Sequence, residues 1–263
     1  MYTFELHKAK SVSDAASILA QTAGKPLAGG QTLIAAMKFR LAQPGTLVDL
    51  SGIAELKGIR REGDTIVIGA MTTHAEVAAS DVVKNAIPAL AALASLIGDR
   101  QVRNMGTIGG SIANNDPAAC YPAGALGLNA TIETNKRQLS AEAFFKGMYQ
   151  TDLAADELIT ALRFPIPTKA AYEKFRNPAS RFALVGVFVA QTKQGVRVAV
   201  TGAAGSVFRS KPLEDALAKN FTADAAKAVK IDPSGLNGDL HASPEYRAHL
   251  IPVLAARAVT ACK

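Results

Sequence analysis

The sequence predicts an α+β protein, in which small α/β units precede an antiparallel sheet with helices. Strand and helix patterns alternate through about the first fifty residues, as expected of an α/β unit. Apolar runs at 183–190 and 195–202 form a hairpin pattern beyond a pair of prolines, Pro165 and Pro167, and the chain after it is largely helical. We therefore predict an N-terminal domain of residues 1–167, divided into subdomains of about 1–52 and 53–167, and a C-terminal domain of residues 168–263.

The first subdomain contains a glycine loop between a strand and a helix. Ser13 is the candidate N-cap of the first helix. The loop Ala28-Gly29-Gly30-Gln31-Thr32 places its N–H groups at the positive end of the second helix, which favours anions. The predicted order is a strand at 4–6, a helix at 11–20, a strand at 26–28, a helix at 33–41 and a strand at 46–50.

The second subdomain begins with a hairpin over 58–69 that turns at 62–64. Thr73 and Glu76 have the spacing of a capping box, and an alanine- and leucine-rich helix is predicted over 85–97. The later elements are predicted from shorter patterns. They are a helix or buried turn at 123–128, a strand at 130–134, a short helix within 139–145, a strand at 157–164, and tail helices at 213–218, 223–229 and 244–260.

A second glycine stretch holds Gly106, Gly109 and Gly110 within five positions, beside the hydroxyl residues Thr107 and Ser111. Glycine lets the bare backbone approach a ligand closely. Two such loops, about seventy-five residues apart, predict one anionic group held from two sides by N–H and hydroxyl donors. Each loop alone has a simpler reading, a strand–helix turn for the first and a helix C-cap followed by a bulge for the second.

Composition excludes several classes of function. The chain has 263 residues and a net charge of +7, but Lys and Arg form no run and aromatic residues are only 6%, so we predict no nucleic-acid partner. Cys120 and Cys262 lie far apart and the four histidines show no ligand spacing, which predicts no metal or cluster site on this chain. Neither a signal-peptide pattern nor a membrane-spanning apolar run is present, and we predict a cytoplasmic protein without a transmembrane segment.

The motifs resemble, in order, those of the flavin-binding medium subunit of molybdenum hydroxylases, the family of xanthine dehydrogenase and aerobic carbon monoxide dehydrogenase. The resemblance covers nearly the whole chain and is strongest to the carbon-monoxide-dehydrogenase-like branch. It implies an FAD-binding domain of the vanillyl-alcohol-oxidase (PCMH) type in two subdomains, followed by a C-terminal domain. The matching motifs are Ala28-Gly-Gly-Gln-Thr32, Gly106-Thr-Ile-Gly-Gly-Ser111, Asp116-Pro-Ala-Ala119, Glu157-Leu-Ile159, and Tyr172-Glu-Lys-Phe175 with Pro178-Ala-Ser-Arg181.

The resemblance also implies which residues bind FAD, with the pyrophosphate between the two glycine loops. Ile159 would touch the isoalloxazine, and Lys174 would lie near the flavin unless it is a surface charge. Asp116 would bond ribityl or ribose hydroxyls, or else only form an Asp-Pro turn. Many relatives have an acidic residue where this chain has Cys120, which we keep as a wall of the site. The full predicted set is Pro26, Leu27, Ala28, Gly29, Gly30, Gln31, Thr32, Leu33, Gly106, Thr107, Ile108, Gly109, Gly110, Ser111, Asp116, Cys120, Ile159 and Lys174.

The function implied by the resemblance is electron transfer. Electrons would leave a molybdenum cofactor on a large partner subunit, cross iron–sulfur clusters on a small partner subunit, and reach an external acceptor through FAD on this chain. The assembly would be a dimer of heterotrimers, and no side chain of this chain would be catalytic or bind metal. A free-standing flavoprotein oxidase and a cofactor-free assembly subunit are the alternatives. The substrate, the acceptor (quinone, NAD or oxygen), and whether the chain holds FAD alone remain open.

Overall fold

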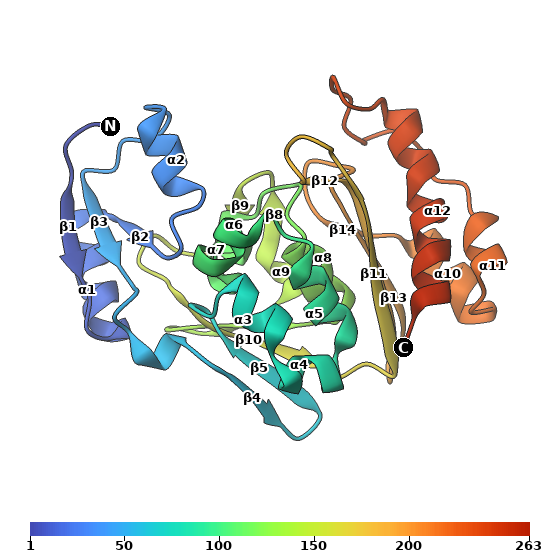
Figure 1. Cartoon of the computed structure of the whole chain (residues 1–263), viewed down its shortest axis with the longest axis horizontal. Coiled ribbons are helices and arrows are strands. Elements are labelled where there is room, and N and C mark those ends of the chain that lie inside the picture. Colours follow the sequence, from blue (N-terminus) through green and yellow to red (C-terminus); the bar gives the residue numbers. More distant parts are fainter.

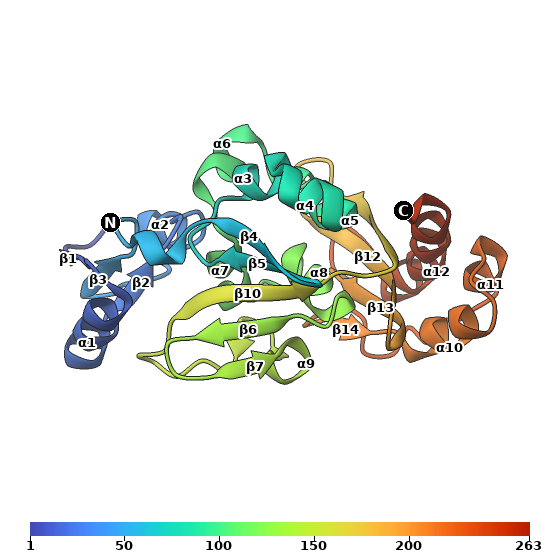
Figure 2. The same cartoon turned by 90° about the horizontal axis from the view of Figure 1, so that it is seen from below.

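A computed structural model describes all 263 residues of the chain, with three larger sheets in a row and one separate two-stranded pair (Figure 1). The parallel sheet of the N-terminal part lies at one end, and the helices of the C-terminal part lie at the other. Between them is a five-stranded sheet with several helices packed beside it (Figure 2). The predicted mixture of an α/β unit, antiparallel sheets and helices is confirmed.

The N-terminal sheet is the predicted α/β unit, with three parallel strands in the order β1-β3-β2. The first helix is present as predicted, but Ser11 rather than Ser13 is its N-cap and accepts from the Asp14 N–H at 3.1 Å. The second helix ends before residue 41, since Arg40 takes a left-handed φ of 60°. The elements are β1 (Glu5–Lys8), α1 (Val12–Thr22), β2 (Lys25–Leu27), α2 (Leu33–Lys38) and β3 (Thr46–Asp49).

The middle sheet is antiparallel and has the strand order β4-β5-β10-β6-β7. Its first two strands form the predicted hairpin, which turns through Gly63 at a φ of 58°. A short 3-10 helix (Ala54–Leu56) precedes the hairpin, and β8 (Phe145–Gly147) and β9 (Gln150–Thr151) form a separate small pair. The strands are β4 (Ile59–Glu62), β5 (Thr65–Gly69), β6 (Thr131–Thr134), β7 (Gln138–Ser140) and β10 (Ile159–Pro165).

The helices of the middle part depart from prediction at 85–97 and around the second glycine stretch, where the helices Arg100–Met105 and Ile108–Asn114 were not predicted. The capping box is present, because Glu76 N–H donates to Thr73 Oγ1 (3.2 Å) and Thr73 N–H donates to Glu76 Oε2 (2.7 Å). The single helix predicted over 85–97 is wrong, since Pro88 lacks an N–H and starts a new helix after a break at Ile87. The helices are α3 (His74–Ala79), α4 (Asp81–Ala86), α5 (Pro88–Ser95), α6 (Arg100–Met105), α7 (Ile108–Asn114), α8 (Tyr121–Gly127) and α9 (Ala141–Phe144).

The C-terminal sheet lies between two hydrophobic cores. Along β12, Phe188 and Ala190 pack into the core of the middle part, whereas Val187 and Val189 pack with the C-terminal helices. This alternation is the period of a strand buried on both faces. Because the sheet shares its core with the middle part, the domain boundary at 167 stays a prediction.

The C-terminal elements contain the predicted hairpin of β12 and β13, with β11 and β14 as additional strands. The longest helix, α12, has 18 residues, and neither it nor any other helix is long and apolar enough to cross a membrane. The elements are β11 (Lys169–Arg176), β12 (Ala183–Thr192), β13 (Gly195–Thr201), β14 (Phe208–Arg209), α10 (Lys211–Lys219), α11 (Ala223–Lys227) and α12 (Pro244–Ala261).

Candidate cofactor-binding site

The two glycine loops lie in direct backbone contact. A Cβ added to Gly29 would lie 2.1 Å from the carbonyl oxygen of Met105 and 2.8 Å from the Cα of Gly106. A Cβ added to Gly110 would lie 3.5 Å from the Cβ of Ala28. The structure therefore brings together two segments about seventy-five residues apart, and only a residue without a side chain fits at position 29.

The first glycine loop carries a run of free hydrogen-bond donors. None of the backbone N–H groups of residues 29–32 donates to an acceptor within the chain. The loop turns at Gly30, whose φ is 69°, and α2 begins at Leu33 without a side-chain cap from Thr32. Consecutive free N–H groups in such a turn, at the start of a helix, form a concave site for an anion such as a phosphate.

The second glycine loop, by contrast, uses most of its N–H groups within the protein. Gly109 N–H donates to the Ala70 carbonyl (2.8 Å), Ile108 N–H to the Thr72 carbonyl (3.0 Å), and Gly110 N–H to Thr107 Oγ1 (3.1 Å). The Thr107 N–H and the Ser111 hydroxyl make no such bond. The two loops thus differ in how many N–H groups are free to bind a ligand. The first loop supplies most of the free donors, and the second is held in place by its own hydrogen bonds and packs against the first.

His74 supports the second glycine loop from beneath. Its N–H donates to the Gly106 carbonyl at 2.9 Å, and a Cβ on Gly106 would lie 2.6 Å from His74 Nε2. Burial, together with the positive charge of Arg103, lowers the pKa of His74 to about 4, so the imidazole is neutral near pH 7. No local pattern predicts that residues 70–74 pair with this loop, because the pairing joins separate segments. The capping box predicts only where the helix starts.

Cys120 and Lys174 form a second group of predicted site residues. The Lys174 Nζ lies 3.3 Å from the Cys120 Sγ and donates to the Leu96 carbonyl at 3.0 Å. No carboxylate lies within ion-pair distance of Lys174, although its side chain is half-buried. Lys174 therefore holds a positive charge at a partly desolvated position without an anionic partner in the chain, while Cys120 is buried beside it.

Asp116 and Ile159 belong to neither group by direct contact. Asp116 Oδ1 accepts from the Ala118 N–H (2.8 Å) and Oδ2 accepts from the Tyr149 hydroxyl (3.4 Å), so this residue forms the Asp-Pro turn. Ile159 is buried in the core that also contains Cys120. The structure brings together the glycine loops, and separately Cys120 with Lys174. Packing connects the two groups, because Ile108 of the second glycine stretch and Cys120 belong to one hydrophobic core.

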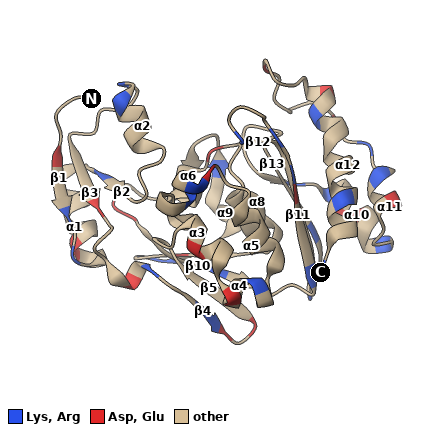
Figure 3. Cartoon of the chain, viewed as in Figure 1, with Lys and Arg blue, Asp and Glu red and all other residues tan.

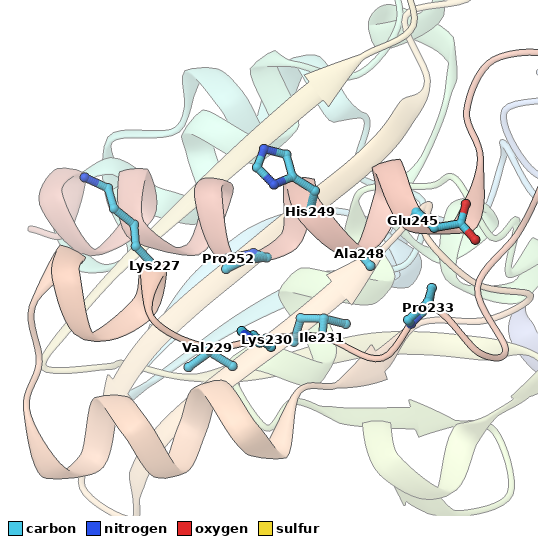
Figure 4. Close-up of a pocket in the computed structure, with 9 residues that line it drawn as sticks. All are labelled: Lys227, Val229, Lys230, Ile231, Pro233, Glu245, Ala248, His249 and Pro252. Carbon is cyan, nitrogen blue, oxygen red and sulfur yellow. The ribbon is translucent and has the colours of Figure 1, made fainter.

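A hollow of about 380 Å³ lies elsewhere, between α12 and the segment that follows α11 (Figure 4). Lys227, Lys230, Glu245 and His249 are among its lining residues, and no residue of either glycine loop contributes. Lys and Arg are likewise spread over all three parts of the molecule (Figure 3). Neither feature competes with the glycine loops as the place for an extended anionic cofactor.

Comparison with known proteins gives a consistent result over the whole chain. Residues 2–167 match the family described as the FAD binding domain in molybdopterin dehydrogenase. The chain is 37% identical to the carbon monoxide dehydrogenase medium chain of Hydrogenophaga pseudoflava, covering 98% of this chain and 96% of that one. It is 34% identical to the nicotine 6-hydroxylase medium subunit of Paenarthrobacter nicotinovorans, covering 95% and 93%. The solved carbon monoxide dehydrogenase of Hydrogenophaga pseudoflava, lacking the Mo-pyranopterin moiety, superposes with a TM-score of 0.90 over 99% of this chain and 97% of that one, at 37% identity.

Proposed function

Since this chain belongs to the FAD-binding family of molybdopterin dehydrogenases, as a medium subunit of the carbon-monoxide-dehydrogenase-like molybdenum hydroxylases, we propose that it carries electrons from a partner to an external acceptor. The electrons would come from iron–sulfur clusters of a small subunit and leave through FAD held here. FAD supplies the redox chemistry when bound, and the protein supplies binding, orientation and electrostatics.

The observation that carries the proposal is the run of free N–H groups at 29–32, closed against Gly106 by the contact of Gly29. A diphosphate needs several converging donors, and these groups, with the Thr107 N–H and the Ser111 hydroxyl, provide them. We propose that the residues of both loops, 26–33 and 106–111, hold the diphosphate. Asp116, Cys120, Ile159 and Lys174 would lie along the rest of the cofactor.

The proposed electron-transfer role also implies partner subunits. We propose a small iron–sulfur subunit and a large molybdenum-binding subunit in a dimer of heterotrimers, because the relatives are medium chains of larger enzymes. Those relatives are named for carbon monoxide and for nicotine, yet each matches this chain over more than nine-tenths of its own length. The organic substrate would therefore be selected on another subunit.

Flavin content and reoxidation of the purified complex test the proposal. We expect stoichiometric FAD by absorbance in the complex, and rapid electron transfer to at least one of quinone, NAD and oxygen after reduction with dithionite. A complex that lacks flavin and does not take up FAD would contradict the proposal. A complex with FAD that, once reduced, passes electrons to quinone, NAD and oxygen no faster than the same complex stripped of FAD would contradict the electron-transfer role alone.

A substitution of Lys174 tests the part of the proposed site that would lie near the flavin ring. We expect Lys174→Met to weaken FAD retention several-fold, because it removes a positive charge that has no carboxylate partner and is free to act on a bound cofactor. The unfolding midpoint should change little, since Met keeps the apolar length of the side chain. Flavin content after desalting, compared with that of Lys174→Arg, measures the effect; equal retention in wild type and Lys174→Met would exclude this role.

A further inference from the structure

Cys120, Tyr172 and Lys174 form a cluster of reactive side chains where the C-terminal sheet meets the middle part. Tyr172 and Lys174 are two residues apart on β11 and therefore point to the same face of that strand. Cys120 directly precedes α8, a helix that packs against β12 and β13 (Figure 2). The Lys174 Nζ lies 3.3 Å from the Cys120 Sγ. A nucleophilic nitrogen and an oxidisable sulfur are thus in contact.

The Lys174 amine is held beside the sulfur by the end of a helix. Its Nζ donates to the carbonyl of Leu96, the C-cap residue of α5, at 3.0 Å. The C-terminal end of a helix carries a partial negative charge, which favours a cation there. No carboxylate pairs with Lys174, so the thiol is its only side-chain partner. A cation beside a cysteine favours the thiolate, which is the form that peroxides attack.

The Tyr172 hydroxyl is a buried donor without an acceptor. Tyr172 is 5% exposed, and its oxygen has no hydrogen-bond partner. Burial, followed by the neighbouring Cys120 thiol, raises the pKa of Tyr172 well above its usual value, so the hydroxyl keeps its proton. Residue 186, on β12 opposite Lys174, is a glycine, and a Cβ there would lie 2.4 Å from the hydroxyl oxygen. A buried donor beside a sulfur is satisfied once that sulfur carries an oxygen.

We propose that Cys120 and Lys174 are a modification site, at which peroxide oxidation of the thiol leads to a covalent sulfenamide bond between Sγ and Nζ. First, hydrogen peroxide oxidises the sulfur by two electrons, and the products are a sulfenic acid at Cys120 and one water. The Lys174 nitrogen then attacks the sulfur, so that the S–N bond forms and the S–O bond breaks. Of the two protons that the ammonium loses, one leaves with the hydroxyl as water and the other goes to solvent.

The cluster supports both steps of this reaction. A separation of 3.3 Å between sulfur and nitrogen is close to that of reacting atoms before attack, and rotation of the lysine side chain brings them together. The Tyr172 hydroxyl donates a hydrogen bond to the sulfenic oxygen and then to the departing hydroxyl. Burial of Cys120, which is 4% exposed, keeps larger thiols away from the sulfenic acid, so that Lys174 is the nucleophile within reach.

The bond removes a charge, because a sulfenamide nitrogen is neutral. We therefore expect the oxidised protein to retain several-fold less FAD, as in Lys174→Met, and this consequence rests on the proposed function. Oxygen becomes hydrogen peroxide when it accepts two electrons, so a complex that reduces oxygen makes the oxidant itself. Dithiothreitol cleaves the S–N bond by forming its own disulfide, which returns the thiol and the amine and should restore FAD retention.

Peptide mass spectrometry of the purified complex tests the bond. The complex is treated with hydrogen peroxide, denatured, alkylated with iodoacetamide and digested with trypsin. We expect residues 104–136 joined to residues 170–176, at a mass two hydrogens below the sum of the two peptides, and separated by dithiothreitol. Cys262 is the internal control, because burial raises the pKa of its thiol to about 11 and we expect it to be alkylated. Joined peptides with an additional oxygen, an unreacted Cys120, or an oxidised Cys120 beside a free Lys174 would each overturn the inference.

Two substitutions test the steps separately. Lys174→Arg keeps a cation but removes the nucleophilic amine, so we expect no joined peptides and a sulfenic acid at Cys120 that dimedone traps. Tyr172→Phe keeps the ring beside Phe188, at a centroid distance of 6.2 Å, but removes the hydroxyl, and we expect the cross-link to form several-fold more slowly. Equal dimedone labelling of Cys120 in wild type and Lys174→Arg, or an unchanged rate in Tyr172→Phe, contradicts the proposed chemistry.

Flavin absorbance after desalting is read on the same samples. Cross-linked protein that keeps its FAD confirms the bond but contradicts the effect of Lys174 on the cofactor. A complex that forms the cross-link but never contains FAD contradicts the proposed function alone. Loss of FAD after peroxide treatment without the cross-link overturns the inference.

Discussion

Gly29→Ala is expected to remove FAD from the complex almost completely, with at least roughly ten-fold lower flavin content at equal protein. The added Cβ would lie 2.1 Å from the Met105 carbonyl oxygen and 2.8 Å from the Gly106 Cα, and because both of these are backbone atoms, no side chain can rotate away to relieve the overlap. The first loop must then separate from the second. That separation displaces the free N–H groups of residues 29–32 from the wall formed by Gly106. The flavin spectrum of the purified complex, after desalting, measures the loss.

Gly45→Ala is the matched control for this prediction. Gly45 lies in the same N-terminal part, no atom lies within 4 Å of a Cβ added there, and its φ is not positive. We expect this variant to keep wild-type FAD content and to unfold at the same temperature. If Gly29→Ala also keeps its flavin, the contact between the loops does not form the site; if both variants lose flavin, the effect is not specific to the loop.

The meeting of the two glycine loops could be predicted because both combine glycines with hydroxyl residues and because their order matched a family. What each loop contributes could not be predicted. The N–H groups of Ile108 and Gly109 are occupied by carbonyls of Thr72 and Ala70. Those bonds join segments about thirty-six residues apart, and no local pattern reveals such a pairing. The resemblance of the motifs therefore indicates the ligand, whereas only the fold determines which donors are free for it.

The errors in the fold have local causes. The apolar spacing over 85–97 suggested one helix, but the missing N–H of Pro88 ends one helix at Ala86 and begins another. The strand β11 was not expected, although Tyr172 and Lys174, which point to the same face of the strand, both belong to the family motif. Its burial depends on pairing with β12, whose Phe188 lies opposite Tyr172. Side chains from separate parts of the chain thus decide what the local sequence leaves undetermined.

Glu157→Gln is expected to be the most destabilising single change among the ion pairs. The Glu157 side chain is 1% exposed, and it accepts from Arg137 Nε (2.9 Å), the Thr134 hydroxyl (2.7 Å) and the Ala154 N–H (3.0 Å). The bonds from Arg137, more than any other cause, lower the pKa of Glu157 from 4.5 to about 2 against the opposing effect of burial. The amide keeps the shape but loses the charge, which should cost about 2–3 kcal/mol of unfolding free energy near neutral pH.

The pH dependence of that difference tests the cause. Because the folded pKa of Glu157 lies below the unfolded one, its contribution is complete above about pH 4.5 and disappears as the pH falls toward about 2. Denaturant unfolding of wild type and Glu157→Gln should therefore differ at neutral pH and converge in acid. Asp156→Asn is the control, since Asp156 pairs with Lys136 at the surface (2.6 Å) and should contribute less than about 1 kcal/mol. A difference that persists unchanged into acid would mean that the hydrogen-bond geometry of the carboxylate, rather than its charge, holds the segment that leads into β10.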